Sequence, residues 1–220
     1  MNRIKSEFYL FIPCIHREQE IVMEHNDSLE RISNEVRGCP LCGLSRTRKN
    51  AVAGEGKQSA RIMFVGEAPG RNEDIKGRPF VGAAGKILDA ALDKAGINRS
   101  EVFITNIVKC RPPENRIPKD DEVHACKPYL ERQIAIIQPK VICVLGRTAF
   151  SSLLGGGSIT ASRGKLVSSK GRKYFLTIHP AAAIYNKKFL SVLEADIKAL
   201  AKISNAGSNS KKHHSLEEYV

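Results

Sequence analysis

Short apolar blocks bounded by turn residues recur along the chain, at residues 62–65, 102–108 and 141–145. Each block is shorter than an ordinary helix and rich in β-branched residues, which favours buried strands. Two further apolar segments, 166–167 and 174–178, flank a short polar turn and predict a hairpin.

Apolar residues at helical spacing lie between these predicted strands. Leu29, Ile32 and Val36 mark one helical face, preceded by Asp27 and Glu30 at the spacing of a capping box. Further helices are predicted over 82–95, from Pro118 through an acidic first turn, after Gly146, and over 188–203. Strands that alternate with helices predict a mostly parallel sheet covered on both faces, with its ligand site at the carboxyl ends of the strands.

The chain has 220 residues, which fits one α/β domain with extensions at both ends. Residues 1–26 have no clear periodicity and are interpreted as a variable N-terminal extension. Residues 27–203 form the predicted domain. Residues 204–220 are polar, and we expect a disordered C-terminal tail.

The chain is strongly basic, with 35 Lys and Arg residues against 23 acidic residues and a net charge of +12. Such an excess indicates an anionic polymer or a membrane surface as partner. No apolar run reaches the length of a membrane span, and the apolar stretch near the start is not followed by the cleavage site of a signal peptide. We therefore expect an intracellular, cytoplasmic protein.

Four of the six cysteines are candidate metal ligands. Cys39 and Cys42 form a CxxC pair, Cys110 follows a predicted strand, and Cys126 lies on the next helix. Without a signal peptide, metal ligation is favoured over disulfide formation. Four thiolates can hold either a structural zinc ion or an iron–sulfur cluster.

Polar residues end three of the predicted strands: Glu67, Asn106 and His179. A polar side chain at a buried strand end needs a partner, so each could be a satisfied turn residue, but three together favour a shared pocket. Phe80, in a stiff Gly- and Pro-containing loop, could face a flat ligand there or simply anchor the core. Candidate phosphate contacts are Arg111, Arg116, Arg163 and Lys187, for which a solvated basic surface is the alternative.

Several motifs together resemble the family 4 uracil-DNA glycosylases, the iron–sulfur enzymes of thermophilic bacteria and archaea. They are Gly-Glu-Ala-Pro-Gly (66–70), Gly-Arg-Pro-Phe-Val-Gly (77–82), Thr-Asn-Ile-Val-Lys-Cys-Arg-Pro-Pro (105–113) and His-Pro-Ala (179–181), after the CxxC pair. The resemblance implies a three-layer α/β/α fold with a central four-stranded, mostly parallel sheet. It also implies a [4Fe-4S] cluster on Cys39, Cys42, Cys110 and Cys126.

The resemblance further implies the role of each site residue. Phe80 would stack on the extruded base, Asn106 would read its O4 and N3 edge, and His179 would contact O2. Glu67 would lie beside the attacking water, and the backbone at Ala68 and Pro69 would line the base site. Glu73 is the candidate for excluding the thymine methyl group, with a solvated loop acid as the alternative.

The expected activity is therefore hydrolysis of the N-glycosidic bond of deoxyuridine in single- or double-stranded DNA by a monomeric, monofunctional glycosylase. Two alternatives remain open at this point: a non-catalytic DNA-binding module with a four-cysteine metal site, and a glycosylase of broader base specificity. Ile184 and Tyr185 are both candidates for the wedge that fills the vacated base stack, in place of the Arg or Leu of many relatives.

Overall fold

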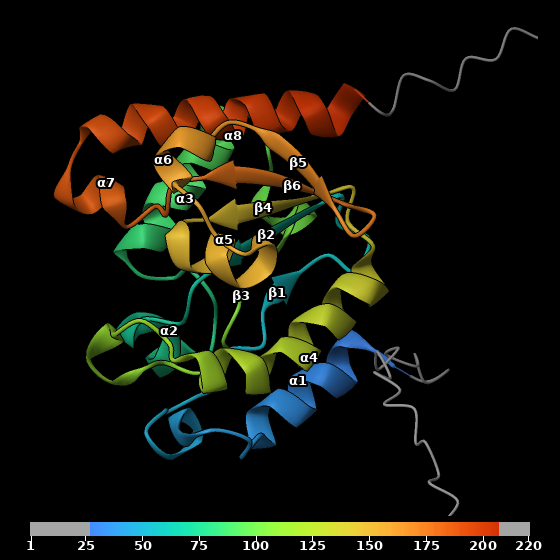
Figure 1. Ribbon diagram of the computed structural model, residues 1–220, viewed down its shortest axis with the longest axis vertical. Coiled ribbons are helices and arrows are strands. Elements are labelled where there is room, and N and C mark those ends of the chain that lie inside the picture. Colours follow the sequence, from blue (N-terminus) through green and yellow to red (C-terminus); the bar gives the residue numbers. More distant parts are fainter. Residues whose placement is uncertain (1–26, 207–220) are drawn as a thin grey trace, which may run out of the picture.

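The computed structural model describes residues 27–206, which form one sheet between two layers of helices (Figure 1). The strands are β1 (Glu55–Gly56), β2 (Ile62–Gly66), β3 (Phe103–Asn106), β4 (Val141–Leu145), β5 (Leu166–Ser169) and β6 (Arg172–Thr177). The α-helices are α1 (Leu29–Gly38), α2 (Arg71–Lys76), α3 (Ala83–Lys94), α4 (Asp120–Ile137), α5 (Arg147–Leu154), α6 (Ile159–Ser162), α7 (Ala182–Tyr185) and α8 (Lys188–Ala206). Short 3-10 turns are η1 (Gly43–Arg46), η2 (Arg99–Glu101) and η3 (Pro113–Asn115).

The sheet has the strand order β1-β3-β2-β4-β6-β5. The four central strands are parallel, while β1 and β5 pair antiparallel at the two edges. The predicted three-layer, mostly parallel architecture is confirmed, but the predicted number of four strands is wrong. The sequence pattern missed β1 because this strand has only two residues and no apolar alternation, and β5 is the outer strand of the predicted hairpin.

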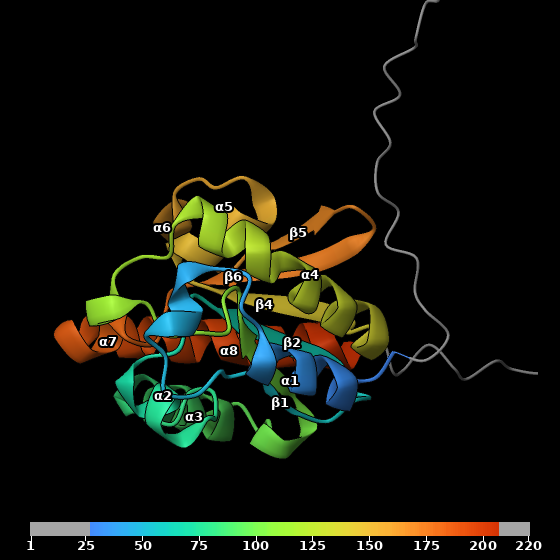
Figure 2. The same cartoon turned by 90° about the horizontal axis from the view of Figure 1, so that it is seen from below.

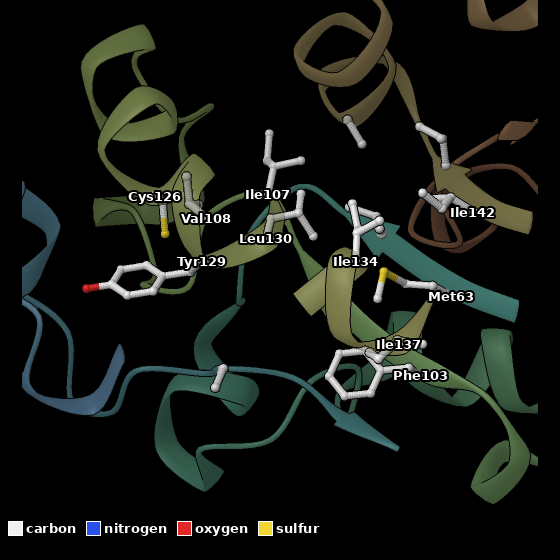
Figure 3. Close-up of a cluster of buried hydrophobic side chains, with 14 of the residues drawn as sticks. Met63, Phe103, Ile107, Val108, Cys126, Tyr129, Leu130, Ile134, Ile137 and Ile142 are labelled. Atoms are coloured by element: carbon white, nitrogen blue, oxygen red, sulfur yellow. The ribbon is translucent and has the colours of Figure 1, made fainter. Parts of the chain in front are cut away.

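Both faces of the central strands are buried, as the continuous apolar blocks predict. Met63 and Val65 of β2 belong to the core under α1 and α4, whereas Ile62 and Phe64 belong to the core under α3 and α8. The two helical layers on opposite sides of the sheet are visible in Figure 2. Figure 3 shows the core under α1 and α4, in which Leu130, Ile134 and Ile137 of α4 pack beside the strands. Cys126 and Tyr129 lie nearer the N-terminus of the same helix.

The ends of the described domain differ in detail from the prediction. The N-cap of α1 is Ser28, whose Oγ accepts from Arg31 N at 3.1 Å, while Asp27 instead forms an ion pair with Arg132. Helix α8 continues past the predicted domain end at residue 203 to Ala206. The predicted extension over residues 1–26 and the remainder of the predicted tail, 207–220, lie outside the described residues. No helix within 27–206 is long and apolar enough to cross a bilayer.

The order of the strands in the sheet brings the polar residues at the strand ends to one edge of the sheet. From β2 the chain passes to β3 on one side and later to β4 on the other, so β2 lies at the switch in winding direction. Crevices at such a switch point, outside the carboxyl ends of parallel strands, are the usual ligand sites of open α/β sheets. Gly66 at the end of β2 is in register with Asn106 at the end of β3.

Candidate active site

A cavity of about 420 Å³ opens beyond the carboxyl ends of β2 and β3. It brings together all the residues expected to contact uracil, as well as Glu73 and Arg116. Its lining consists of Glu67, Ala68, Pro69, Gly70, Glu73, Phe80, Ala84, Asn106, Pro112, Asn115, Arg116, His179, Ala181 and Tyr185. A larger hollow of about 760 Å³ lies at the opposite end of the sheet, beside the starts of β4 and β6, and none of the predicted site residues lines it.

Asn106 presents an unpaired acceptor at this cavity. Its side chain is buried, and its Oδ1 atom has no hydrogen-bond partner among the described residues. A buried polar atom without a partner costs about 1–3 kcal/mol, so its persistence indicates a ligand that supplies a donor. Gly66 makes room for it, because a Cβ at this position would meet Asn106 Oδ1 at 2.5 Å and Phe80 Cζ at 2.7 Å.

The imidazole of His179 offers a donor to the same cavity. Its Nδ1 accepts from the backbone N–H of Ala181 at 3.2 Å, so in the neutral ring the hydrogen is carried by Nε2. Burial lowers the pKa of His179 to about 4, and the nearby Glu73 carboxylate opposes this shift. His179 is therefore neutral near pH 7, and its ring lies 5.7 Å from that of Phe80 at an interplanar angle of 32°.

The loop that carries Phe80 is held from two sides. On the inner side, Glu73 Oε1 accepts from the backbone N–H groups of Val81 at 2.9 Å and Gly82 at 2.8 Å, while its Oε2 accepts from Gly70 N at 3.1 Å. On the outer side, Arg99 donates to the carbonyl of Pro79 at 2.8 Å.

These contacts have a strained backbone to hold. Phe80 has a φ of 49°, which is unfavourable for a bulky residue. Gly85 allows this conformation, because a Cβ there would meet the carbonyl oxygen of Phe80 at 1.9 Å. Glu73 thus spans the Gly70 turn and the Phe80 loop, and it is not the solvated loop acid that the sequence left as an alternative.

Glu67 follows β2 directly and lines the cavity with a half-buried side chain. Its backbone carbonyl accepts from Val108 N at 3.2 Å, which fixes the turn. Within residues 27–206 nothing hydrogen-bonds to its carboxylate, which leaves both oxygens available to a ligand or water.

The four candidate cysteines lie around a second, small pocket at the end of α1 and the start of α4. Cys39, Cys42, Cys110 and Cys126 line it together with Val36, Leu41, Arg48, Lys109, Ala125 and Tyr129. Arg48 Nη1 donates to Cys110 Sγ at 3.0 Å, and Lys109 N donates to Cys126 Sγ at 3.2 Å.

The donor set of this pocket suits a metal centre with thiolate ligands. Burial raises the pKa of the Cys126 thiol to about 11 and also raises the pKa of Cys110, so ionisation of these two thiols needs added positive charge such as bound iron would supply. Across residues 27–206, no three His, Cys, Asp or Glu side chains are arranged to hold a single metal ion. Four thiols around one pocket, with N–H donors to two sulfurs, fit the ligands of an iron–sulfur cluster.

Comparison with known proteins places this arrangement in a family. Residues 53–201 match the family described as the uracil DNA glycosylase superfamily. A type-4 uracil-DNA glycosylase of Sulfurisphaera tokodaii is 50% identical over 188 residues, which cover 81% of this chain and 86% of that protein. The type-4 enzyme of Saccharolobus solfataricus is 50% identical over 78% of this chain and 84% of that protein. That of Archaeoglobus fulgidus is 41% identical over 88% of this chain and its own full length.

The chain belongs to the type-4 uracil-DNA glycosylases. The resemblance inferred from the motifs is thereby confirmed, and so is the membership of the glycosylase fold.

The candidate DNA contacts of this type-4 glycosylase are distributed unevenly. Arg116 lines the cavity and forms a two-pronged ion pair with Glu122, at 2.8 and 2.6 Å. Arg111 donates to Asn115 Oδ1 at 2.8 Å, close to the same rim. Arg163 is instead held by the buried carboxylate of Asp196. Lys187 is exposed just after α7.

Sequence reasoning missed several residues that support the glycosylase site. Arg99 fixes the Phe80 loop and also pairs with Glu55 and Asp89, contacts that join distant segments and leave no local signal. Lys109 belongs to the 105–113 motif but had no role assigned to it, yet it is buried and lines the cysteine pocket. Its position directly after a buried strand and before Cys110 was the available signal.

Proposed function

We propose that this chain hydrolyses the N-glycosidic bond of deoxyuridine in DNA, releasing uracil and leaving an abasic site. The observation that carries the proposal is the partnerless Oδ1 of Asn106, a residue that lines the same cavity as Phe80 and as His179, whose neutral ring carries its hydrogen on Nε2. Uracil supplies the complement of this set: one N–H donor, a carbonyl oxygen beside it, and a flat ring.

Asn106 would select the base. Its Oδ1 accepts the N3–H of uracil, and its amide NH₂ donates to O4. Cytosine has an acceptor at N3 and a donor at C4, so a fixed amide rejects it. Phe80 provides a face for the pyrimidine ring, at a position that Glu73 and Arg99 maintain.

His179 and Glu67 would carry the chemical step. Cleavage leaves negative charge on the base, largely on O2, and a donor from the neutral His179 stabilises this charge as it develops. The sugar gains positive charge and is attacked by water, which the carboxylate of Glu67 orients and balances electrostatically. The available carboxylate oxygens of Glu67 support this assignment.

Entry of the base requires that it leave the duplex stack. Tyr185 lines the cavity and its side chain is 89% exposed, whereas Ile184 is 48% exposed and is not part of the lining. We therefore assign the wedge to Tyr185, with Arg111, Arg116 and Lys187 near the rim as phosphate contacts. Arg163 is the least suited of the four expected contacts to bind phosphate, because Asp196 holds it and, unlike the similarly paired Arg116, it does not line the cavity.

The cofactor of the proposal is a [4Fe-4S] cluster on Cys39, Cys42, Cys110 and Cys126. Its contribution when bound is structural, because four cysteine ligands leave no coordination position for substrate and the hydrolysis transfers no electrons. Held by these four cysteines, the cluster would tie the ends of α1 and α4 to the segment that follows β3 and would so support the loop after Asn106.

The remaining expectations belong to the same proposal. The glycosylase unit comprises residues 27–203, flanked by the extension 1–26 and the tail 204–220, and it acts as an intracellular monomer on single- or double-stranded DNA. Among the two alternatives, a non-catalytic DNA-binding module leaves the combination of Asn106, His179 and Phe80 without a purpose. A glycosylase of broader specificity conflicts with the complementarity of Asn106 to uracil.

The test is incubation of the purified protein with an oligonucleotide carrying one uracil, followed by alkaline strand cleavage. We expect scission at the uracil, none in the matched thymine or cytosine oligonucleotide, and a large loss in the Glu67→Gln variant. No scission by the iron-loaded protein would refute the enzymatic assignment. Unimpaired excision by Glu67→Gln would remove Glu67 from the mechanism.

A further inference from the structure

Lys109 is a buried lysine that lies between the base cavity and the cysteine pocket. Its side chain is 1% exposed, and its ammonium group donates three hydrogen bonds. The acceptors are Thr105 Oγ1 at 2.6 Å, the backbone carbonyl of Asn106 at 2.9 Å and Gln133 Oε1 at 2.7 Å. Every proton of the ammonium group thus has a partner, one of which belongs to the base-reading residue.

The bonds of Lys109 join three separate segments. Gln133 is on α4, and its Nε2 donates to the carbonyl of Ala53 at 2.7 Å, which also accepts from Thr105 Oγ1 at 3.0 Å. The carbonyl of Lys109 itself accepts from Val52 N at 2.7 Å. The carboxyl end of β3, where Asn106 lies, is therefore bonded to α4 through the ammonium group of Lys109. It is bonded to the 52–53 segment through the side chain of Thr105 and the carbonyl of Lys109.

The backbone of Lys109 reaches the cysteine pocket. Its N–H donates to Cys126 Sγ at 3.2 Å, and the next residue is Cys110. All three acceptors of the ammonium group are neutral oxygens, so hydrogen bonds hold the side chain. Lys109 therefore contacts the base-reading residue with its side chain and the cysteine site with its backbone.

We propose that Lys109 is a positioning residue that couples the cysteine site to base recognition: its ammonium group holds the carbonyl of Asn106, and its backbone N–H holds Cys126 Sγ. The proposal rests on the proposed function, since it assigns Asn106 to the base. Loss of the ammonium bonds releases the carboxyl end of β3 from α4, the helix that carries both Gln133 and Cys126. The base-reading amide and a cluster ligand therefore lose their positions together.

The first test is a double-mutant cycle between Lys109→Met and Asn106→Ala, measured as kcat/KM on uracil-containing DNA and as Kd for free uracil. Methionine keeps the length and removes the charge and the donors, and Lys86→Met on the exposed face of α3 is the matched control. We expect Lys109→Met to reduce kcat/KM at least tenfold in the parent and less than twofold in the Asn106→Ala background. Additive effects in a folded, iron-loaded protein would overturn the coupling.

The second test needs no activity. Iron content and absorbance near 400 nm are measured for Lys109→Met and Lys86→Met after identical purification and air exposure. We expect at least a twofold lower cluster content for Lys109→Met only, and equal contents would overturn the link to the cysteine site.

If Lys109→Met does not fold, Thr105→Val takes its place in both tests, because it removes one acceptor of the ammonium group. The expected changes in kcat/KM and in cluster content have the same direction as for Lys109→Met. Additivity or unchanged cluster content in Thr105→Val would then overturn the corresponding half of the proposal. Activity of the parent on uracil DNA is measured alongside, so failure of the proposed function is distinguished from failure of the coupling.

Discussion

The backbone N–H of Ala181 donates to Nδ1 of His179 and thereby leaves the imidazole hydrogen on Nε2. The two residues belong to one His-Pro-Ala segment, so the strand end that delivers the histidine also sets its tautomer. A protonated His179 would place a hydrogen on Nδ1, opposite the hydrogen of Ala181. Burial and this contact both favour the neutral ring.

The first prediction concerns pH. Because the pKa of His179 is lowered from 6.5 to about 4, the folded protein keeps this ring neutral while an unfolded chain would already bind a proton. The stability that neutral His179 contributes is therefore present above pH 6.5 and is lost as the pH falls from there through about 4. We expect kcat/KM to be independent of His179 ionisation between pH 6 and 8 and to fall near pH 4.

The measurement is the free energy of unfolding as a function of pH for the parent, His179→Gln and, as control, the exposed His124→Gln on α4, with kcat/KM of the parent followed over the same range. The stability lost between pH 6.5 and 4 should be smaller in His179→Gln than in the parent and unchanged in the control. An equal loss in the parent and in His179→Gln would show that the burial of His179 does not set its ionisation.

The second prediction separates activity from stability at Asn106. Since its Oδ1 has no partner in residues 27–206, Asn106→Leu should not lower the melting temperature. It should reduce kcat/KM on uracil DNA about 10- to 100-fold, because hydrogen bonds to the base are worth about 1–3 kcal/mol. Calorimetry and steady-state kinetics check the two parts.

Thr105→Val is the control for this second prediction, since Thr105 is equally buried and fully bonded. It should lower the free energy of unfolding by about 1–3 kcal/mol. A stability loss in Asn106→Leu as large as that in Thr105→Val would mean that Asn106 is bonded within the protein.

The third prediction concerns the space behind the base cavity. In Gly66→Ala the new methyl group would meet Asn106 Oδ1 and Phe80 Cζ well inside contact distance, so both must move. We expect loss of detectable uracil binding by calorimetry. Gly38→Ala is the matched control, because nothing lies within 4 Å of its Cβ, and it should bind uracil as the parent does. Normal uracil binding by Gly66→Ala would show that the base cavity does not need the space that Gly66 leaves beside Asn106 and Phe80.

The fourth prediction concerns Glu73, whose carboxylate accepts three backbone N–H groups. Glu73→Ala leaves these donors unpaired and should lower the free energy of unfolding by about 3 kcal/mol, with a higher KM for uracil DNA as Phe80 loses its position. Glu73→Gln keeps the shape and one acceptor oxygen, so its free energy of unfolding should fall less than that of Glu73→Ala. Denaturant unfolding and kinetics measure both variants.

Exclusion of thymine by Glu73 is tested on the same Glu73→Ala protein with a T·G mismatch. Thymine release would support the exclusion. A variant that remains uracil-specific would contradict it and leave Glu73 with the positioning of Phe80 alone.

The fifth prediction concerns the exposed ring of Tyr185. If it fills the vacated stack, Tyr185→Ala should reduce excision from double-stranded DNA about tenfold or more and change excision from single strands little. Ile184→Ala on the same helix is the control and should have a small effect on both. An equal loss on the two substrates, or a larger loss in Ile184→Ala, would exclude Tyr185 as the wedge.

The apolar blocks of the sequence and the turn residues between them predicted most of the central strands and the long helices. Strands β2, β4 and β6 and helices α3, α4 and α8 lie within a few residues of their predicted ranges, because burial on one or two faces imposes a periodicity that short windows reveal. Polar residues at the strand ends could also be assigned to one site, since parallel strands bring their carboxyl ends to the same edge of a sheet.

Only the tertiary structure decided which partners these side chains have. The sequence alone could not tell that Arg163 is held by Asp196, that Arg99 reaches Pro79, or that Asn106 keeps a free acceptor, because such contacts join segments far apart along the chain. The same holds for the edge strand β1, too short to carry a pattern, and for Lys109, whose burial depends on α4 covering it. The residue types and local secondary structure can be inferred from neighbouring residues. The hydrogen-bond partner and the protonation of a buried group depend instead on the side chains that the fold packs around it.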